Sequence, residues 1–239
     1  MHKEVFEYVE SMLRRVDVSG KAVLEAGSYD FNGTVRPMFM ARQPAEYIGV
    51  DILEGPGVDV VCSAGALVDR FGEHRFDVVV TTEMMEHVQD WRAAVSHMKR
   101  VLKPGGVLIL TTRSRGEPYH GYPHDYWRYE LDDMRTIFDD MELLDLSPDP
   151  SRGGVFLTAR KPEGFAERDL SDIALYSILT HRRTRRVARP IEWLIIRWIG
   201  LIKQSYVWMV KARMFIWQRL LPLPLRRLLK RTLFRERPA

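Results

Sequence analysis

Short apolar runs punctuate the first two thirds of the chain, and stretches with apolar residues at helical spacing separate them. A continuous run of β-branched and aliphatic residues is typical of a parallel strand that is covered on both faces. The predicted strands are 23–26, 46–51, 58–62, 76–81, 107–112, 142–146 and 154–159. The predicted helices between them are 3–16, 34–42, 91–102 and 134–140. Strands that alternate with helices indicate an α/β fold with a doubly wound sheet.

The turn after the first strand is the strongest local signal for a ligand site. The apolar run breaks at Gly27, where a missing Cβ lets the backbone approach a ligand closely. Asp51 ends the second strand, 24 residues after Gly27, and an acid there can accept both hydroxyls of a ribose. The turn carries Glu25 and Tyr29 and lacks the Gly-x-Gly-x-x-Gly that holds a pyrophosphate. A nucleoside without a pyrophosphate therefore fits this turn better than a dinucleotide.

Four segments in this order resemble the class I S-adenosylmethionine-dependent methyltransferases. They are Glu25-Ala-Gly27, Gly49-Val-Asp51, Phe76 to Val88 with its Glu86-His87-Val, and Leu102-Lys-Pro-Gly-Gly106. The resemblance covers about residues 20–161. It implies a Rossmann-like seven-stranded sheet of order 3-2-1-4-5-7-6, with the seventh strand antiparallel, and S-adenosylmethionine as the cofactor.

The same resemblance implies a set of cofactor contacts at the carboxyl ends of the first four strands. They are Glu25, Gly27, Ser28, Tyr29, Asp51, Ile52, Ser63, Ala64 and Glu83. The family often carries an acid for the adenine amino group where Ser63 stands here, so we expect backbone groups and Ser63 to replace that contact.

Methyl transfer to a hydroxyl needs a base, because a neutral alcohol is a poor nucleophile. The loop 117–129, after the fifth strand, contains two histidines and five aromatic residues and follows the carboxyl edge of the sheet. His120, His87 and His124 are therefore the candidate bases, with an anchoring role for the loop motif as the alternative. Glu83 and Glu86 could gather a divalent metal with these histidines, but no known ligand spacing is present and we predict no metal.

The acceptor predicted is a hydroxyl of a sugar, glycan or glycolipid. The segment after the fourth strand is Thr-Thr-Glu-Met, unlike the Asn/Asp-Pro-Pro-Tyr of amino-group methylation, and the only cysteine, Cys62, lies on the third strand. The segment Pro123-His-Asp-Tyr-Trp-Arg-Tyr129 resembles methyltransferases of polysaccharide and glycolipid biosynthesis. A lipid or quinone methyltransferase and a non-catalytic adaptor with this fold remain the alternatives.

Charge divides the chain into two unlike parts. Residues 181–239 contain sixteen Lys/Arg and two acids, a net charge of +14, whereas the remainder carries −10. With one cysteine and no signal-peptide pattern in residues 1–20, we expect a cytoplasmic protein. We predict a methyltransferase domain over 1–163 and a basic, amphipathic helical extension over 164–239.

The predicted extension contains two helices, one over 170–187 and a second from Pro190. Four of the six tryptophans lie in it, and its aliphatic and basic residues fall on opposite helix faces. This pattern is typical of a helix lying on an anionic membrane surface, here through residues 182–237 and on the inner face of the membrane. A helical cap or a homo-oligomer interface is the alternative, and nucleic acid is the least expected partner because the apolar face is wide.

Overall fold

The computed structural model describes residues 2–121 and 124–187. The chain forms two compact units, Met1–Val187 and Ala188–Ala239. Residues 164–187, assigned to the extension above, are part of the first unit. The second unit lies outside the described residues, and with it the helix predicted from Pro190 and the basic end that follows.

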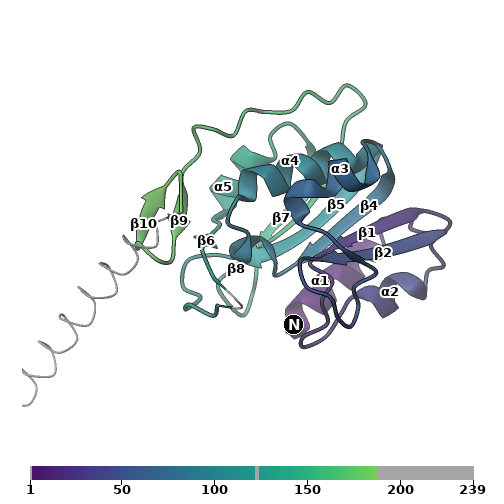
Figure 1. Ribbon diagram of the computed structural model, residues 1–239, viewed down its shortest axis with the longest axis horizontal. Helices are drawn as coiled ribbons and strands as arrows, with labels where there is room; N and C mark the ends of the chain where they lie inside the picture. Colours follow the sequence, from purple (N-terminus) through teal and green to yellow (C-terminus); the bar gives the residue numbers. More distant parts are fainter. Residues whose placement is uncertain (1, 122–123, 188–239) are drawn as a thin grey trace, which may run out of the picture. The chain divides into compact units, whose positions relative to one another are not determined.

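A seven-stranded sheet is the centre of the first unit (Figure 1). Its order is β3-β2-β1-β4-β5-β8-β7. The strands are β1 (Ala22–Ala26), β2 (Glu46–Asp51), β3 (Val60–Val61), β4 (Phe76–Thr82), β5 (Leu102–Arg113), β7 (Glu142–Pro148) and β8 (Gly154–Arg160). β8 is antiparallel to both neighbours and the other pairs are parallel. The predicted sheet, including its antiparallel seventh strand, is confirmed.

Alternate residues of the strands enter two separate cores, one on each face of the sheet. Leu24 and Val79 belong to the core beneath α3 (Leu67–Phe71), α4 (Trp91–Val101) and α5 (Leu131–Ile137). Val23 and Val80 belong to the core beneath α1 (Lys3–Leu13) and α2 (Arg36–Met40). Both sides of each central strand are therefore covered, which explains why these strands read as continuous apolar runs.

Two short 3-10 helices, η1 (Ala64–Ala66) and η2 (Met85–His87), follow β3 and β4. The helix α4 begins as expected, because the Asp90 carboxylate accepts a hydrogen bond from the Ala93 N–H at 3.2 Å. The turn Lys103–Gly106 interrupts the pairing of β4 with β5, whose register shifts between Phe76 and Val78.

A second sheet of three short strands corrects the prediction of a helix over 170–187. It has the order β10-β9-β6, formed by β6 (Trp127–Arg128), β9 (Leu175–Ser177) and β10 (Arg182–Thr184). His181 adopts a left-handed φ of 54° in the turn between β9 and β10, which a continuous helix does not allow. The predicted helix is wrong because strand pairing with β6, 47 residues or more away in the sequence, outweighs the local helical pattern.

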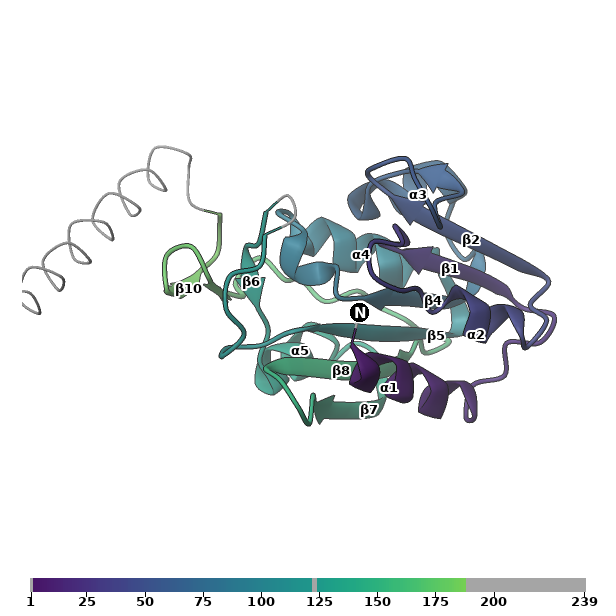
Figure 2. The ribbon, with the colours of Figure 1, turned by 90° about the horizontal axis from the view of Figure 1, so that it is seen from below.

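The segment that leads to β9 runs along the side of the sheet that α3, α4 and α5 cover (Figure 1). Arg92 of α4 holds this segment, since its guanidinium donates to the carbonyl oxygens of Leu170 and Ile173. It also donates to the carbonyl oxygen of Arg185, directly after β10. The small sheet lies beyond one end of the large sheet, next to the β5–β6 loop of residues 114–126 (Figure 2). Within residues 2–121 and 124–187, no helix has the length and apolarity needed to cross a membrane.

Candidate active site

Gly27 holds the turn after β1 close against the chain that follows β4. Its φ of +81° lies in the left-handed region, and a Cβ at this position would be 2.7 Å from the Cβ of Met84. The N–H groups of Gly27 and Ser28 donate to the carbonyl of Val50 at 2.9 and 3.0 Å. The turn is therefore built before any ligand binds, and only glycine fits its first position.

The loops after β1 and β2 pack against each other over Gly55 and Gly57. A Cβ on Gly55 would lie 2.3 Å from the ring of Tyr29, and one on Gly57 would lie 2.4 Å from the carbonyl oxygen of Ser28. The Asp30 N–H donates to the Pro56 carbonyl at 2.8 Å. Ser28 is only 2% exposed, with its Oγ against Gly49. Its N–H, which donates to Val50, and its hydroxyl are therefore both enclosed by the turn.

Asp51 stands at the end of β2 with its carboxylate partly exposed. Its Oδ1 accepts the Leu53 N–H at 3.1 Å, and Oδ2 lies 3.4 Å from the N–H of Tyr29. The next two side chains, Ile52 and Leu53, are 59% and 43% exposed, which is unusual for aliphatic residues. An oriented carboxylate beside exposed aliphatic groups suits the ribose and adenine of a nucleoside.

Ser63 and Ala64 lie at the start of η1, after β3. The Ser63 Oγ caps this helix by accepting the Gly65 N–H at 3.2 Å, and Ala64 is buried. The Ser63 hydroxyl therefore already has one partner and keeps a proton to donate.

Glu25 lies within the sheet rather than at its edge. It is 2% exposed and accepts a hydrogen bond of 2.7 Å from the Tyr47 hydroxyl on β2. Burial raises the pKa of Glu25 to about 7, although the Tyr47 hydrogen bond acts in the opposite direction.

Replacing Glu25 by glutamine is expected to stabilise the fold at alkaline pH. The pKa is raised in the folded state from an ordinary value of 4.5, so the folded protein is most stabilised at low pH and loses this contribution as pH rises through about 7. By linkage the loss is up to about 3 kcal/mol. Glu25→Gln should exceed wild type in urea denaturation at pH 8.5 and match it near pH 4.5. Glu142→Gln, at an exposed acid, is the control, and an equal difference at both pH values would contradict the assignment.

Glu83 follows β4 in a left-handed conformation with φ of 55°. Its Oε1 accepts the Thr111 hydroxyl at 3.1 Å, and its carboxylate pairs with Arg113. Arg113 also contacts His2 at 2.9 Å, and His2 contacts Asp149 at 2.9 Å. Burial, with the charge of Glu86, raises the pKa of Glu83 to about 8 despite Arg113. Arg113 therefore links Glu83, which follows β4, to the chain ahead of α1.

Glu86 is the centre of a cluster that the sequence only partly predicts. Its side chain is fully buried, and its Oε2 accepts the Thr112 hydroxyl at 3.0 Å. Its Oε1 has no hydrogen-bond partner and lies 3.7 Å from His120 Nε2 and 3.9 Å from His87 Nε2. Burial acts to raise the pKa of Glu86, but the two imidazoles and Arg113 lower it overall. The carboxylate is thus held ionised beside two histidines.

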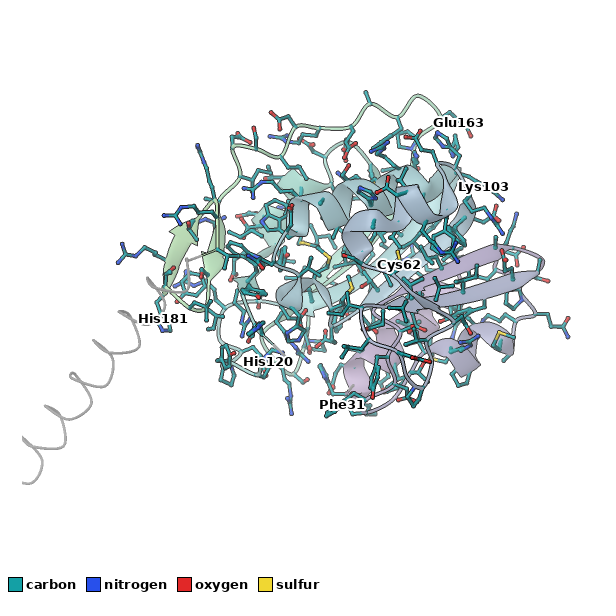
Figure 3. The ribbon with its side chains drawn as sticks, viewed as in Figure 1. Phe31, Cys62, Lys103, His120, Glu163 and His181 are labelled. Carbon is teal, nitrogen blue, oxygen red and sulfur yellow. The ribbon has the colours of Figure 1, made fainter. Side chains whose placement is uncertain are left out.

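His87 and His120, both candidate bases, lie together and His124 does not. The rings of His87 and His120 are 5.2 Å apart in an edge-on arrangement. The neighbouring Glu86 raises the pKa of His120, against the effect of burial. The ring of His124 is exposed beside Tyr126, and its carbonyl oxygen lies 2.6 Å from His87 Nδ1. In Figure 3, His120 lies on the same side of the molecule as His181, away from Lys103 and Glu163.

Asp125 and Arg128 fix the loop that carries His120. Both side chains are fully buried, and two hydrogen bonds of 2.5 and 2.6 Å join them. Arg128 also donates to the carbonyls of Glu117 and Pro118, and Asp125 accepts the His120 N–H at 3.0 Å. Trp127 is buried and donates to the carbonyl of Val88. The anchoring interpretation of this motif is confirmed, since its Asp, Trp and Arg serve the loop's structure.

A family model for a methyltransferase domain matches residues 1–146. The chain belongs to this methyltransferase family. The match confirms the predicted enzyme class, and with it the methyltransferase's cofactor, S-adenosylmethionine.

Curated relatives of the methyltransferase are similar over part of its length. A ubiquinone biosynthesis O-methyltransferase of Pseudomonas entomophila is 35% identical over 115 residues, which are 42% of this chain and 48% of the relative. One from Pseudomonas fluorescens is 34% identical over the same shares. The chain thus spans about half the length of the curated relatives it matches.

Solved structures share the fold of the methyltransferase. The 1,6-didemethyltoxoflavin-N1-methyltransferase of Burkholderia thailandensis has a TM-score of 0.54 at 18% identity, covering 66% of this chain and 79% of that one. An S-adenosylmethionine-dependent methyltransferase from Mesorhizobium loti has a TM-score of 0.52 at 14% identity, covering 66% and 98%. At such identities the likeness supports the fold and leaves the acceptor open.

The cluster around Glu86 also has the donor types of a metal site. One ligand atom from each of Glu86, His87 and His120 lies within 4.8 Å of the others. Imidazole nitrogen with carboxylate oxygen suits a divalent transition metal. Glu83, by contrast, is occupied with Arg113 and lies outside this group.

Proposed function

We propose that this methyltransferase acts on a hydroxyl oxygen of an aromatic, lipid-type acceptor such as a quinone precursor. The support comes from the relatives at 34–35% identity, whose names specify ubiquinone biosynthesis and O-methylation. The observation in the structure that favours oxygen as the acceptor is the imidazole of His120 beside the ionised, buried Glu86. An oxygen nucleophile needs such a base, since its proton must leave as the methyl group arrives.

Cofactor binding is attributed to the turn after β1 and to Asp51. S-Adenosylmethionine supplies a methyl group on a sulfonium that is already activated for transfer. The Asp51 carboxylate would accept hydrogen bonds from the ribose hydroxyls, and the exposed Ile52 would cover the base. The turn at Gly27, which has no Cβ, would let the cofactor approach the backbone. These residues bind and orient, and none needs to change its charge during the reaction.

His120 is assigned as the base that removes the proton of the acceptor's hydroxyl. Its Nδ1 lies 3.0 Å from the Pro118 carbonyl, which can only accept, so Nδ1 holds the proton and Nε2 is free to receive another. When the acceptor hydroxyl is methylated, its proton would pass to Nε2 of His120. The imidazolium is then stabilised by the Glu86 carboxylate 3.7 Å away.

A sugar acceptor is the second candidate. The aromatic residues of the loop 117–129 support it less than their number in the sequence indicates. Two of its aromatic residues, Trp127 and Tyr129, are 1% exposed and belong to the core. Tyr119, 52% exposed and adjacent to His120, is still available for stacking on a sugar or on an aromatic ring.

Asp51→Ala is expected to weaken S-adenosylmethionine binding by about 10- to 100-fold, because it removes hydrogen bonds to a charged group. Calorimetric titration of wild type and variant measures the change. Asp17→Ala, at another acid that caps a turn, should bind as wild type does. Equal affinity of Asp51→Ala and wild type would contradict the cofactor assignment.

The acceptor class is tested by transfer of a labelled methyl group to alkylated catechols and to sugars, assayed in parallel. Catechol methylation that exceeds sugar methylation supports the proposal. Transfer to sugars alone would replace it by the second candidate.

A further inference from the structure

Four arginines gather around the small sheet, and we refer to Arg115, Arg182, Arg183 and Arg185 as the arginine edge. All four side chains are exposed. Three come from β10 or the residue after Thr184, and Arg115, from the β5–β6 loop, stacks its guanidinium 4.7 Å from the ring centre of Tyr176 on β9. Arg183 pairs with Asp133, but its side chain is still 49% exposed. The edge thus presents a concentration of positive charge to solvent.

Backbone hydrogen bonds join this edge directly to the loop that carries His120. Strand β9 pairs with β6 in the register Trp127 with Ser177 and Arg128 with Tyr176. The Ile178 N–H donates to the Tyr126 carbonyl at 3.0 Å. A surface that binds the arginine edge would therefore also fix the orientation of the β5–β6 loop.

The chain beyond the edge continues the same charge. Residues 188–239 contain twelve Lys/Arg, two acids and four tryptophans. Basic residues with tryptophan are typical of segments that bind the interface of an anionic bilayer. Positive charge near such a surface contributes through attraction to the lipid head groups.

We propose that the arginine edge docks on an anionic phospholipid bilayer and thereby turns the β5–β6 loop, with Tyr119 and His120, toward the membrane. The inference rests on the proposed function, because a lipid-type acceptor would reach the enzyme from that surface. The membrane occupant is favoured over nucleic acid by the connection of the edge to the loop and by the tryptophans of the chain that follows.

The test is co-sedimentation of the full-length protein with vesicles of phosphatidylcholine containing 30% phosphatidylglycerol. Arg115→Gln with Arg182→Gln should weaken binding by about 25-fold, as each basic residue at an anionic surface contributes about a factor of five. Arg14→Gln with Arg70→Gln, directly after α1 and on α3, makes the same change of net charge and should bind as wild type. Sodium chloride at 0.5 M should release the wild type, since screening shortens the attraction.

Several results would overturn the inference. These are equal binding to pure phosphatidylcholine, equal losses in the two double variants, or displacement of the protein from vesicles by equimolar single-stranded DNA. Binding of S-adenosylmethionine is measured on each variant in parallel. If the wild type bound S-adenosylmethionine but not the vesicles, the docking alone would be rejected. If the wild type did not bind S-adenosylmethionine, the proposed function would be rejected.

Discussion

We expect His120→Gln to lower kcat by about 10²- to 10⁴-fold, the range for loss of a general base. Glutamine keeps the size and polarity of the side chain but cannot take up a proton. S-Adenosylmethionine affinity should stay unchanged, because the assigned cofactor contacts lie on other loops. His124→Gln is the matched control and should retain activity within about threefold, since that ring is exposed and lies beside Tyr126.

The pH profile separates a base from a structural histidine. Activity should rise with pH through a pKa above 6.5, because Glu86 raises the pKa of His120 and the base must be neutral to act. Glu86→Gln removes the stabilising carboxylate, and the rising limb should move to lower pH. A His120→Gln enzyme with nearly wild-type kcat, or an unmoved limb in Glu86→Gln, would contradict the role.

Metal dependence would give the same histidine another task. If chelation abolished activity and a divalent ion restored it, His120 would act as a ligand with Glu86 and His87, whose donor atoms lie close enough. Full activity in the presence of a chelator supports the general base.

Breaking the Asp125–Arg128 pair is expected to cost about 3–5 kcal/mol of unfolding free energy, the range for removal of one partner from a buried ion pair. In Arg128→Met, the Asp125 carboxylate loses both guanidinium bonds and the carbonyls of Glu117 and Pro118 lose their donor. For a unit of this size the loss corresponds to a melting temperature lower by roughly 10 °C.

Two comparisons make this stability prediction specific. Arg160→Met breaks an exposed pair with Glu142 and should change stability by less than about 1 kcal/mol. Arg128→Lys keeps the charge but not the two-pronged geometry, and should recover only part of the loss. If Arg128→Met were as stable as Arg160→Met in urea denaturation, the Asp125–Arg128 pair would not be what holds the loop.

The large sheet was predictable because its information is local. The central strands β1, β4 and β5 are apolar runs, and both of their faces are buried by helices whose own spacing is visible. The small sheet was not predictable on the same grounds. Strands of two or three residues carry too little pattern, and β9 exists because β6 offers a pairing edge that only the folded chain brings near.

The residues of the candidate site also differ in how far the sequence could predict their roles. Asp51 and Gly27 follow from strand ends and a glycine turn, whereas the roles of Glu25 and Glu83 depend on Tyr47 and Arg113, which face them from other strands. Glu86 shows the limit most clearly. The sequence marks it as an acid beside a histidine, but only the structure gives its full burial and its distance from His120.

The hydrogen bonds between β6 and β9 have a consequence for how such an enzyme can change its acceptor. A segment of the family domain and a segment beyond residue 146 form one strand pair, so the β5–β6 loop is not an independent module. A loop exchanged between relatives would arrive without the strand that supports it. The orientation of the β5–β6 loop therefore depends on two stretches of sequence together, and a substitution near Tyr176 should alter the loop that carries His120.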